Sequence, residues 1–514
     1  MQLEARRREL HAIALEAFEK LFANELHQHY EELAYHSEQA ARTEKALSYL
    51  TFAGNNARDS YQNLQALDYY RRALQIMPVD VFDQQYQLHR ECEKILTELG
   101  KPDERAQEVE ILHSLAGKIG EIGRQAEVEL IRARLLVSAG NYKESITRAE
   151  HAIKLALEAK RYDVSIDAYQ TLFDSYYQQG MYDKAVKYGK LGLEISQGHE
   201  TSRDEAFILN RLGLAFLELE DLSTANSFFE QSLNMFRNHD NLSGVARILA
   251  NLGLVAGRQG DYIAALDYCE QALELAREIG SRKGEALLLG NLGWFSGLLG
   301  DYRKALSYAE RNLKISREIG DKFVETYSLI NISSHAGALG DNVASVKYAE
   351  EGIEIARQSN DRNAEAWALT YLGHGLFESG NMDKAQVAYQ AALTLRDELD
   401  QPVLATEPGA GLARIAFIQG KSSEATAYVE TIMPYLQQDA TLKGTDQPVR
   451  VYLNCYLVLY SVKDLRVDDV LEAGYDLLMK RANGISDPSA RQMFLGGITY
   501  NKEFLAFWEK RKQS

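Results

Sequence analysis

A turn signal recurs every 40 residues along most of this chain. It is a glycine, usually followed by a polar and an aromatic residue: Gly140-Asn141-Tyr142, Gly180-Met181-Tyr182, Gly260-Asp261-Tyr262, Gly300-Asp301-Tyr302, Gly340-Asp341-Asn342 and Gly380-Asn381-Met382. Glu220-Asp221-Leu222 and Gly420-Lys421-Ser422 take two further steps. Glycine accepts the left-handed backbone that ends a helix. A fixed period of this length predicts a stack of similar units, each packed only on its neighbours.

Within each 40-residue unit, the spacing of the residues is that expected of two helices. A Leu-Gly pair stands before the turn, at Leu212-Gly213, Leu252-Gly253, Leu292-Gly293 and Leu372-Gly373. A small residue follows the turn by five positions, at Ala185, Ala225, Ala265, Ala305, Ala385 and Ala425. Because a glycine inside a helix costs roughly 1 kcal/mol relative to alanine, its recurrence indicates close helix packing. The predicted fold class is all-α, a right-handed α-solenoid (superhelix) of helix hairpins with about a 40-residue period.

These features resemble the tetratricopeptide repeat. The best match is the stretch from Asn63 to Pro78, NLQALDYYRRALQIMP, including its closing proline. The central repeats exceed the family's usual 34 residues and run on through segments such as Leu275 to Gly280. In this they are similar to the repeats of spindle-orientation adaptors and kinesin light chains. The resemblance implies that the concave face binds a peptide or protein.

The two ends resemble bacterial signal-transduction NTPases of the STAND or AAA type that carry tetratricopeptide arms, some of them linked to adenylate cyclases. The resemblance rests on residues 29–36 and 45–50, and on Ile485-Ser486-Asp487-Pro488, Arg491, Phe494-Leu495 and Asn501. Capping helices at the two ends of a repeat stack are the alternative explanation. The phosphate-binding loop of such an NTPase is missing, because Ile415 stands where that loop would need a glycine before Gly420-Lys421-Ser422.

The spacing and the resemblance together predict four regions. They are an N-terminal helical junction or cap (1–60), irregular repeats (61–120), the regular array (121–440), and a C-terminal hairpin with capping helices (441–514). The chain is then either the arm of a larger protein or a free-standing relative.

The composition of the chain limits the kinds of partner that it is expected to bind. The formal charge of -17, from 57 Lys and Arg against 74 Asp and Glu, repels phosphate backbones, so no nucleic-acid partner is expected. No run of apolar residues is long enough to cross a membrane, and no membrane partner is expected. Cys92, Cys269 and Cys455 lie far apart, which fits buried thiols in a reducing, cytoplasmic setting. The 11 histidines show no ligand spacing, so we expect no metal, no cofactor and no catalytic residue.

The candidate site lies on the first helices, whose faces would line the groove. One slot, two residues before the repeat glycine, holds Asn251, Asn291, Asn331 and, in a flanking repeat, Tyr371. An asparagine offers both donors and an acceptor to a peptide backbone, although the same amides could bridge helices within the stack. Other groove slots hold Arg247, Trp294, Tyr327, Trp367, His374 and Phe377. Aromatic residues dominate interface hot spots, but a core role is the alternative for each of them.

We therefore predict a protein-interaction module, not an enzyme. It would bind a peptide or protein segment in the concave groove, as the sensor or regulatory arm of a signalling system. An NTPase module in the same or another chain is a candidate partner. The alternative, implied by resemblance to a bacterial maltose regulator, is an arm that senses a small molecule such as a sugar. An enzyme of unrecognised type is the third hypothesis.

Overall fold

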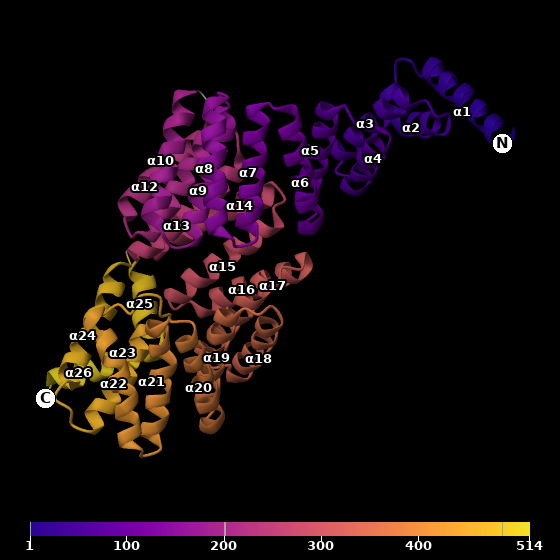
Figure 1. The fold of residues 1–514 in the computed structure, drawn as a ribbon. Helices are drawn as coiled ribbons and strands as arrows, with labels where there is room; N and C mark the ends of the chain where they lie inside the picture. The colour runs from indigo at the N-terminus through magenta and orange to yellow at the C-terminus, as the bar shows by residue number, and fades with distance from the viewer. Residues whose placement is uncertain (1, 200–201, 486, 514) are drawn as a thin grey trace. The chain divides into compact units, whose positions relative to one another are not determined.

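The computed structural model describes residues 2–199, 202–485 and 487–513. Within these ranges the chain is all-helical, with α-helices α1 to α26, one short 3-10 helix, η1, and no strand (Figure 1). Ser486, part of the tail resemblance, lies outside the described residues. The chain forms two compact units, residues 1–220 and 221–514. The division falls inside the span predicted as one regular array, and the four predicted regions remain predictions.

The first unit is a series of helix hairpins. Its helices are α1 (Gln2–Leu21), η1 (Leu26–Gln28), α2 (Tyr30–Gln39), α3 (Thr43–Asp59), α4 (Asn63–Ile76), α5 (Phe82–Glu98), α6 (Pro102–Ile119), α7 (Ile122–Ser138), α8 (Tyr142–Glu158), α9 (Tyr162–Gln178), α10 (Tyr182–Gly198) and α11 (Ser202–Glu218). Successive helices pack on one another from α1 to α11. The unit is a solenoid of antiparallel pairs.

The second unit continues the same pattern and ends in less regular helices. Its helices are α12 (Leu222–Asn238), α13 (Leu242–Gln259), α14 (Tyr262–Glu278), α15 (Arg282–Leu298), α16 (Tyr302–Ile319), α17 (Lys322–Ala338), α18 (Asn342–Gln358), α19 (Arg362–Glu378), α20 (Met382–Glu398), α21 (Pro402–Ile418), α22 (Ser422–Gln438), α23 (Pro448–Ser461), α24 (Val467–Asn483), α25 (Pro488–Gly497) and α26 (Thr499–Gln513). The odd-numbered helices α13 to α21 are the first helices of the repeats.

The predicted turns are confirmed. The turn glycines have left-handed backbone, for example a φ of 86° at Gly260 and 76° at Gly380, and Glu220 takes the same conformation at 62°. A second set of turns lies midway between them, at Lys160, Asp240, Gly280, Gly320, Asn360 and Asp400. The residue after a turn is often polar and caps the next helix. Asp261, after Gly260, does so by accepting a hydrogen bond from the backbone N–H of Ala264 at 3.0 Å.

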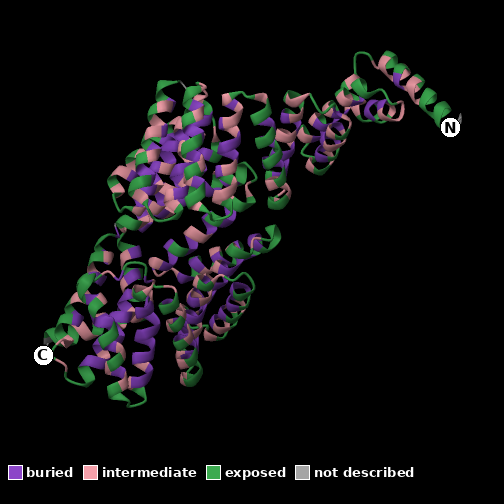
Figure 2. Ribbon diagram, in the orientation of Figure 1, coloured by how far each residue is buried: buried purple, intermediate pink, exposed green. Residues whose placement is uncertain are grey.

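The helical glycines mark close packing, as predicted. A methyl group at Gly253 would lie 2.9 Å from Sγ of Cys269 and 3.2 Å from the carbonyl oxygen of Ala265. One at Gly373 would lie 2.5 Å from ring atoms of Tyr389. The buried residues follow the inward faces of the hairpins in each unit (Figure 2). Each unit, over its described residues, therefore has a series of small cores between neighbouring helices.

We predict that Gly373→Ala destabilises the second unit by about 1–3 kcal/mol, the usual cost of an overpacked core. The new methyl group would collide with Tyr389, which is itself 1% exposed. The free energy of unfolding from chemical denaturation measures the effect. Gly496→Ala is the matched control, since nothing lies within 4 Å of its new methyl group. Equal stability of the two variants would contradict the prediction.

Candidate functional site

The first helices α13, α15 and α17 present one common face. Residues at the seventh, eleventh and fourteenth positions after the preceding turn lie on the same side of a helix, because side chains three or four apart are neighbours. These slots hold most of the predicted site residues. Arg247 is exposed, and Asn251, Asn291, Asn331 and Tyr327 are half-buried. We call the surface that these slots form on α13, α15 and α17, together with Phe323 one helical turn before Tyr327, the open face.

The open face also carries apolar side chains in solvent. Trp294, predicted from the sequence, is 41% exposed, and Leu287 and Phe323 are 53% and 63% exposed. The ring of Phe323 lies 4.8 Å from that of Tyr327. Leu287 and Phe323 were missed by the sequence analysis. Leu287 occupies the same slot as Arg247 and Tyr327, so the 40-residue register alone could have found it.

The C-terminal end of the predicted site is closed by the chain itself. Tyr371 is 4% exposed and donates a hydrogen bond to the carboxylate of Asp446, in the loop between α22 and α23. The side chain of Trp294 also acts on Asp446, favouring its charged form. Burial, with the charge of Glu407, raises the pKa of Asp446 to about 6, against the opposing effects of Tyr371 and Trp294. The loop thus brings Asp446 to two predicted site residues, from α15 and α19.

His374 belongs to a buried hydrogen-bonded group. Its Nδ1 lies 2.6 Å from the hydroxyl of Tyr389 and its Nε2 lies 3.0 Å from Oε1 of Glu407. The other carboxylate oxygen accepts the backbone N–H of Gln447 at 3.3 Å. Burial lowers the pKa of His374 and raises that of Glu407. A neutral imidazole held at both nitrogens is a structural link between α19, α20 and α21.

Trp367 has a partner within the stack as well. The guanidinium of Arg396, which is 1% exposed, lies 4.6 Å from the centre of its ring. Nη1 of Arg396 donates to Asn363 and Gln401, both at 2.6 Å. Trp367 is half-buried, so this cation–π contact anchors one of its faces.

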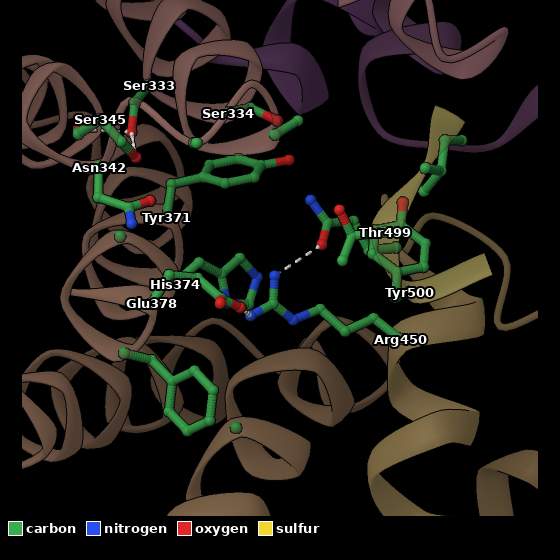
Figure 3. A pocket seen from close by; sticks show the side chains of 18 of the residues that line it. Ser333, Ser334, Asn342, Ser345, Tyr371, His374, Glu378, Arg450, Thr499 and Tyr500 are labelled. Carbon is green, nitrogen blue, oxygen red and sulfur yellow. Dashed lines mark hydrogen bonds and ion pairs between the residues drawn. The ribbon is translucent and has the colours of Figure 1, made fainter. Parts of the chain in front are cut away.

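A cavity of about 300 Å³ lies beyond the open face, in the second unit. Its walls come from α17, α19, α21 and α23 and from the corner where α25 meets α26 (Figure 3). Tyr371, His374 and Phe377 line it, whereas the other predicted site residues do not. The corner lies against the turn between α15 and α16, because a methyl group at Gly300 would come within 3.0 Å of the carbonyl oxygen of Met493. Tyr302 and Tyr500 both line the cavity, close enough to act on each other's pKa values.

No group of three or more His, Cys, Asp or Glu in the described part of the chain could hold a metal ion. None of the helices over the same ranges is long and apolar enough to cross a membrane.

A known family model matches part of the repeat array. The family model described as tetratricopeptide repeat matches residues 174–238 and 244–318. This chain contains tetratricopeptide repeats. The tetratricopeptide array is a protein-interaction fold, and the second matched range includes α15 and all but the first two residues of α13 on the open face.

Solved structures similar to the tetratricopeptide array come from several organisms. A Signal Transduction ATPase with Numerous Domains (STAND) protein with a tetratricopeptide repeat sensor, from Pyrococcus horikoshii, is 17% identical with a TM-score of 0.48, over 80% of this chain and 54% of that one. Aspartyl phosphate phosphatase F from Bacillus subtilis is 16% identical with a TM-score of 0.48, over 68% and 94%. BtubC (BKLC) from P. vanneervenii is 23% identical with a TM-score of 0.39, over 43% and 91%. The comparison with curated proteins gives no match.

Proposed function

We propose that this chain binds a peptide or protein segment on the open face of α13, α15 and α17. The observation that carries the proposal is the alignment of two kinds of side chain on one surface. Leu287, Trp294 and Phe323 are 53%, 41% and 63% exposed, and large apolar side chains gathered in solvent mark interaction sites. They lie on the same helices as the half-buried amides of Asn291 and Asn331.

The two kinds of side chain have complementary roles in this proposal. An asparagine amide can donate to a carbonyl and accept from an N–H of an extended peptide, and a set repeated every 40 residues would hold the backbone without reading its sequence. Trp294 and Phe323 would select apolar side chains, since aromatic anchors provide most of the affinity at such interfaces. Arg247, exposed on α13, would add a preference for an acidic side chain at that end.

The remaining predicted residues take a supporting part in this proposal. Trp367, Tyr371 and His374 have partners within the chain, and we assign them, with Phe377, to the closed end that bounds the open face. The proposed setting is the regulatory arm of a signalling system, acting on an effector such as an NTPase module. Its support is the sequence resemblance of the two ends of the chain. In this role the chain binds and does not catalyse.

The experiment is selection of linear peptides from a displayed library, followed by titration of the selected peptides. We expect Asn251→Ala, Asn291→Ala and Asn331→Ala, made together, to weaken peptide binding at least about 10-fold, since each lost pair of hydrogen bonds contributes about 1 kcal/mol. The thermal midpoint should stay close to that of the wild type. The control is a triple substitution at exposed residues of second helices, namely Lys314, Glu354 and Glu274. Unchanged affinity, or a cooperative unfolding transition lost in the Asn variant, would contradict the proposal.

A further inference from the structure

The cavity at the closed end has the dimensions of a small-molecule site. Its volume of about 300 Å³ lies at the lower end of the range for ligand pockets, about 300–1,000 Å³. At roughly 30 Å³ for each water molecule, it has room for a ligand of about ten non-hydrogen atoms. Tyr371 and His374 lie on one side of the space and Thr499 and Tyr500 on the other, with Arg450 reaching in between (Figure 3).

The charges that line the cavity are unevenly placed. The side chains of Arg450 and Arg414 are 16% and 22% exposed, whereas those of Glu378 and Glu503 are 51% and 42% exposed. Among the charged residues that line the cavity, the cations therefore lie deeper than the carboxylates. Arg450 donates to Glu378 at 3.1 Å, but Arg414 and Glu503 are 3.9 Å apart, too far for a hydrogen bond. Glu407, which is 2% exposed, is a buried carboxylate whose charge also acts on Arg450, so Arg414 is the less compensated of the two cations.

Two polar atoms in the wall have no hydrogen-bond partner among the described residues. They are Nη1 of Arg414, on α21, and Oδ1 of Asn342, at the start of α18. Burial lowers the pKa of Arg414, against the opposing effect of the carboxylates of Glu503 and Glu378. Buried polar groups in proteins are normally hydrogen-bonded, and an unpaired one costs about 1–3 kcal/mol. A ligand with an acceptor at one end and a donor at the other would satisfy both.

Hydroxyl groups also line the cavity. Tyr302, Ser334, Thr499 and Tyr500 all contribute to the wall. Burial raises the pKa values of Tyr302 and Tyr500, so both phenols keep their protons at neutral pH. Hydroxyl groups both donate and accept, and such a wall suits a ligand that carries hydroxyl groups itself.

We propose that this cavity binds a small hydroxylated organic oxyanion, a carboxylate or a phosphate ester, with its anionic group at Arg414 and Arg450. The planar guanidinium group pairs with both kinds of oxyanion through two parallel N–H donors. The hydroxyl groups of the ligand would face Asn342 and the tyrosines. This site lies at the closed end and does not depend on peptide binding at the open face.

The experiment compares three probes of similar size: D-glycerate, glycerol 3-phosphate and glycerol. Titration calorimetry with the full chain should show at least one of the two anions binding at least 10-fold more tightly than uncharged glycerol. A preference for glycerate would assign a carboxylate ligand, and a preference for glycerol 3-phosphate would assign a phosphate ester. Equal binding of glycerol, or no binding of either anion at 10 mM (roughly the weakest affinity expected of a specific site), would overturn the proposal.

Two variants locate the binding. Arg414→Gln should weaken anion binding at least 10-fold, and Arg311→Gln, at an exposed position of α16, should leave it unchanged. Thr499→Glu places a carboxylate at an exposed position of the cavity wall and should also weaken the anions without affecting glycerol. It keeps the test valid if Arg414→Gln fails to fold. Anion binding that survives in every folded variant lies elsewhere and would overturn the proposal.

Discussion

His335→Phe is expected to stabilise the second unit by about 1–3 kcal/mol at pH 7. His335 lies on α17, is 5% exposed, and neither ring nitrogen has a hydrogen-bond partner among the described residues. The ring of His335 packs closely on Gly297, since a methyl group on Gly297 would lie 2.8 Å from Cε1 of His335. Phenylalanine keeps a ring of similar shape at this contact. The substitution removes two buried polar atoms that make no bond, and each such atom is costly. Denaturant unfolding of the two proteins measures the difference.

The advantage of this variant should grow as the pH falls. Burial lowers the pKa of His335 to about 4 from an ordinary value of 6.5. Between these values the unfolded chain binds a proton that the folded chain does not, so the wild type loses stability as the pH falls from 6.5 to 4. A shift of this size corresponds to about 3 kcal/mol. A difference in stability between the two proteins that is constant from pH 7 to 4 would contradict the assignment.

His374→Phe is expected to have the opposite sign and to destabilise the unit by about 2–5 kcal/mol. His374 is as buried as His335, at 6% exposed, but both of its nitrogens are hydrogen-bonded. Its loss leaves the hydroxyl of Tyr389 and the carboxyl group of Glu407 without this partner, and each buried polar group left without a hydrogen bond costs about 1–3 kcal/mol, more if it is charged. The same unfolding measurement reports the effect.

The two histidines form a matched pair, since they occupy the first helices of consecutive repeats and receive the same substitution. We expect the free energy of unfolding to rise for His335→Phe and to fall for His374→Phe. If both variants lose the same stability, shape and not hydrogen bonding decides the result at these positions, and the role assigned to the Glu407 pair is wrong.

The repeat architecture could be predicted because its signals are local. Glycine is needed where the backbone is left-handed, and Gly260 and Gly380 show that conformation. The second set of turns was less visible, because Lys160, Asp240 and Asn360 take left-handed backbone without glycine. Asparagine and aspartate tolerate it better than other residues, but they also occur in many other places.

The closed end could not be predicted from the sequence. Asp446 meets Tyr371 only because the chain after α22 turns back on α19, a contact between residues 75 apart in sequence. Nothing in the spacing of either residue indicates this. The contacts of Tyr302 with Tyr500 and of Gly300 with Met493 have the same origin, and together they form the cavity. Contacts between segments so far apart in the sequence depend on tertiary packing, which the 40-residue period does not predict.

Site-specific photo-crosslinking tests the open face most directly. A photoreactive phenylalanine analogue is placed at Leu287, exposed on the open face of α15, or at Val343, which is 82% exposed on the second helix α18. A peptide selected with the wild-type chain is then irradiated with each protein. We expect the peptide to crosslink at position 287 and not at 343, and the adduct to be lost when Asn251, Asn291 and Asn331 are replaced by alanine. Crosslinking at 343 alone, or an adduct at 287 that the asparagine substitutions leave unchanged, would contradict peptide binding on the open face.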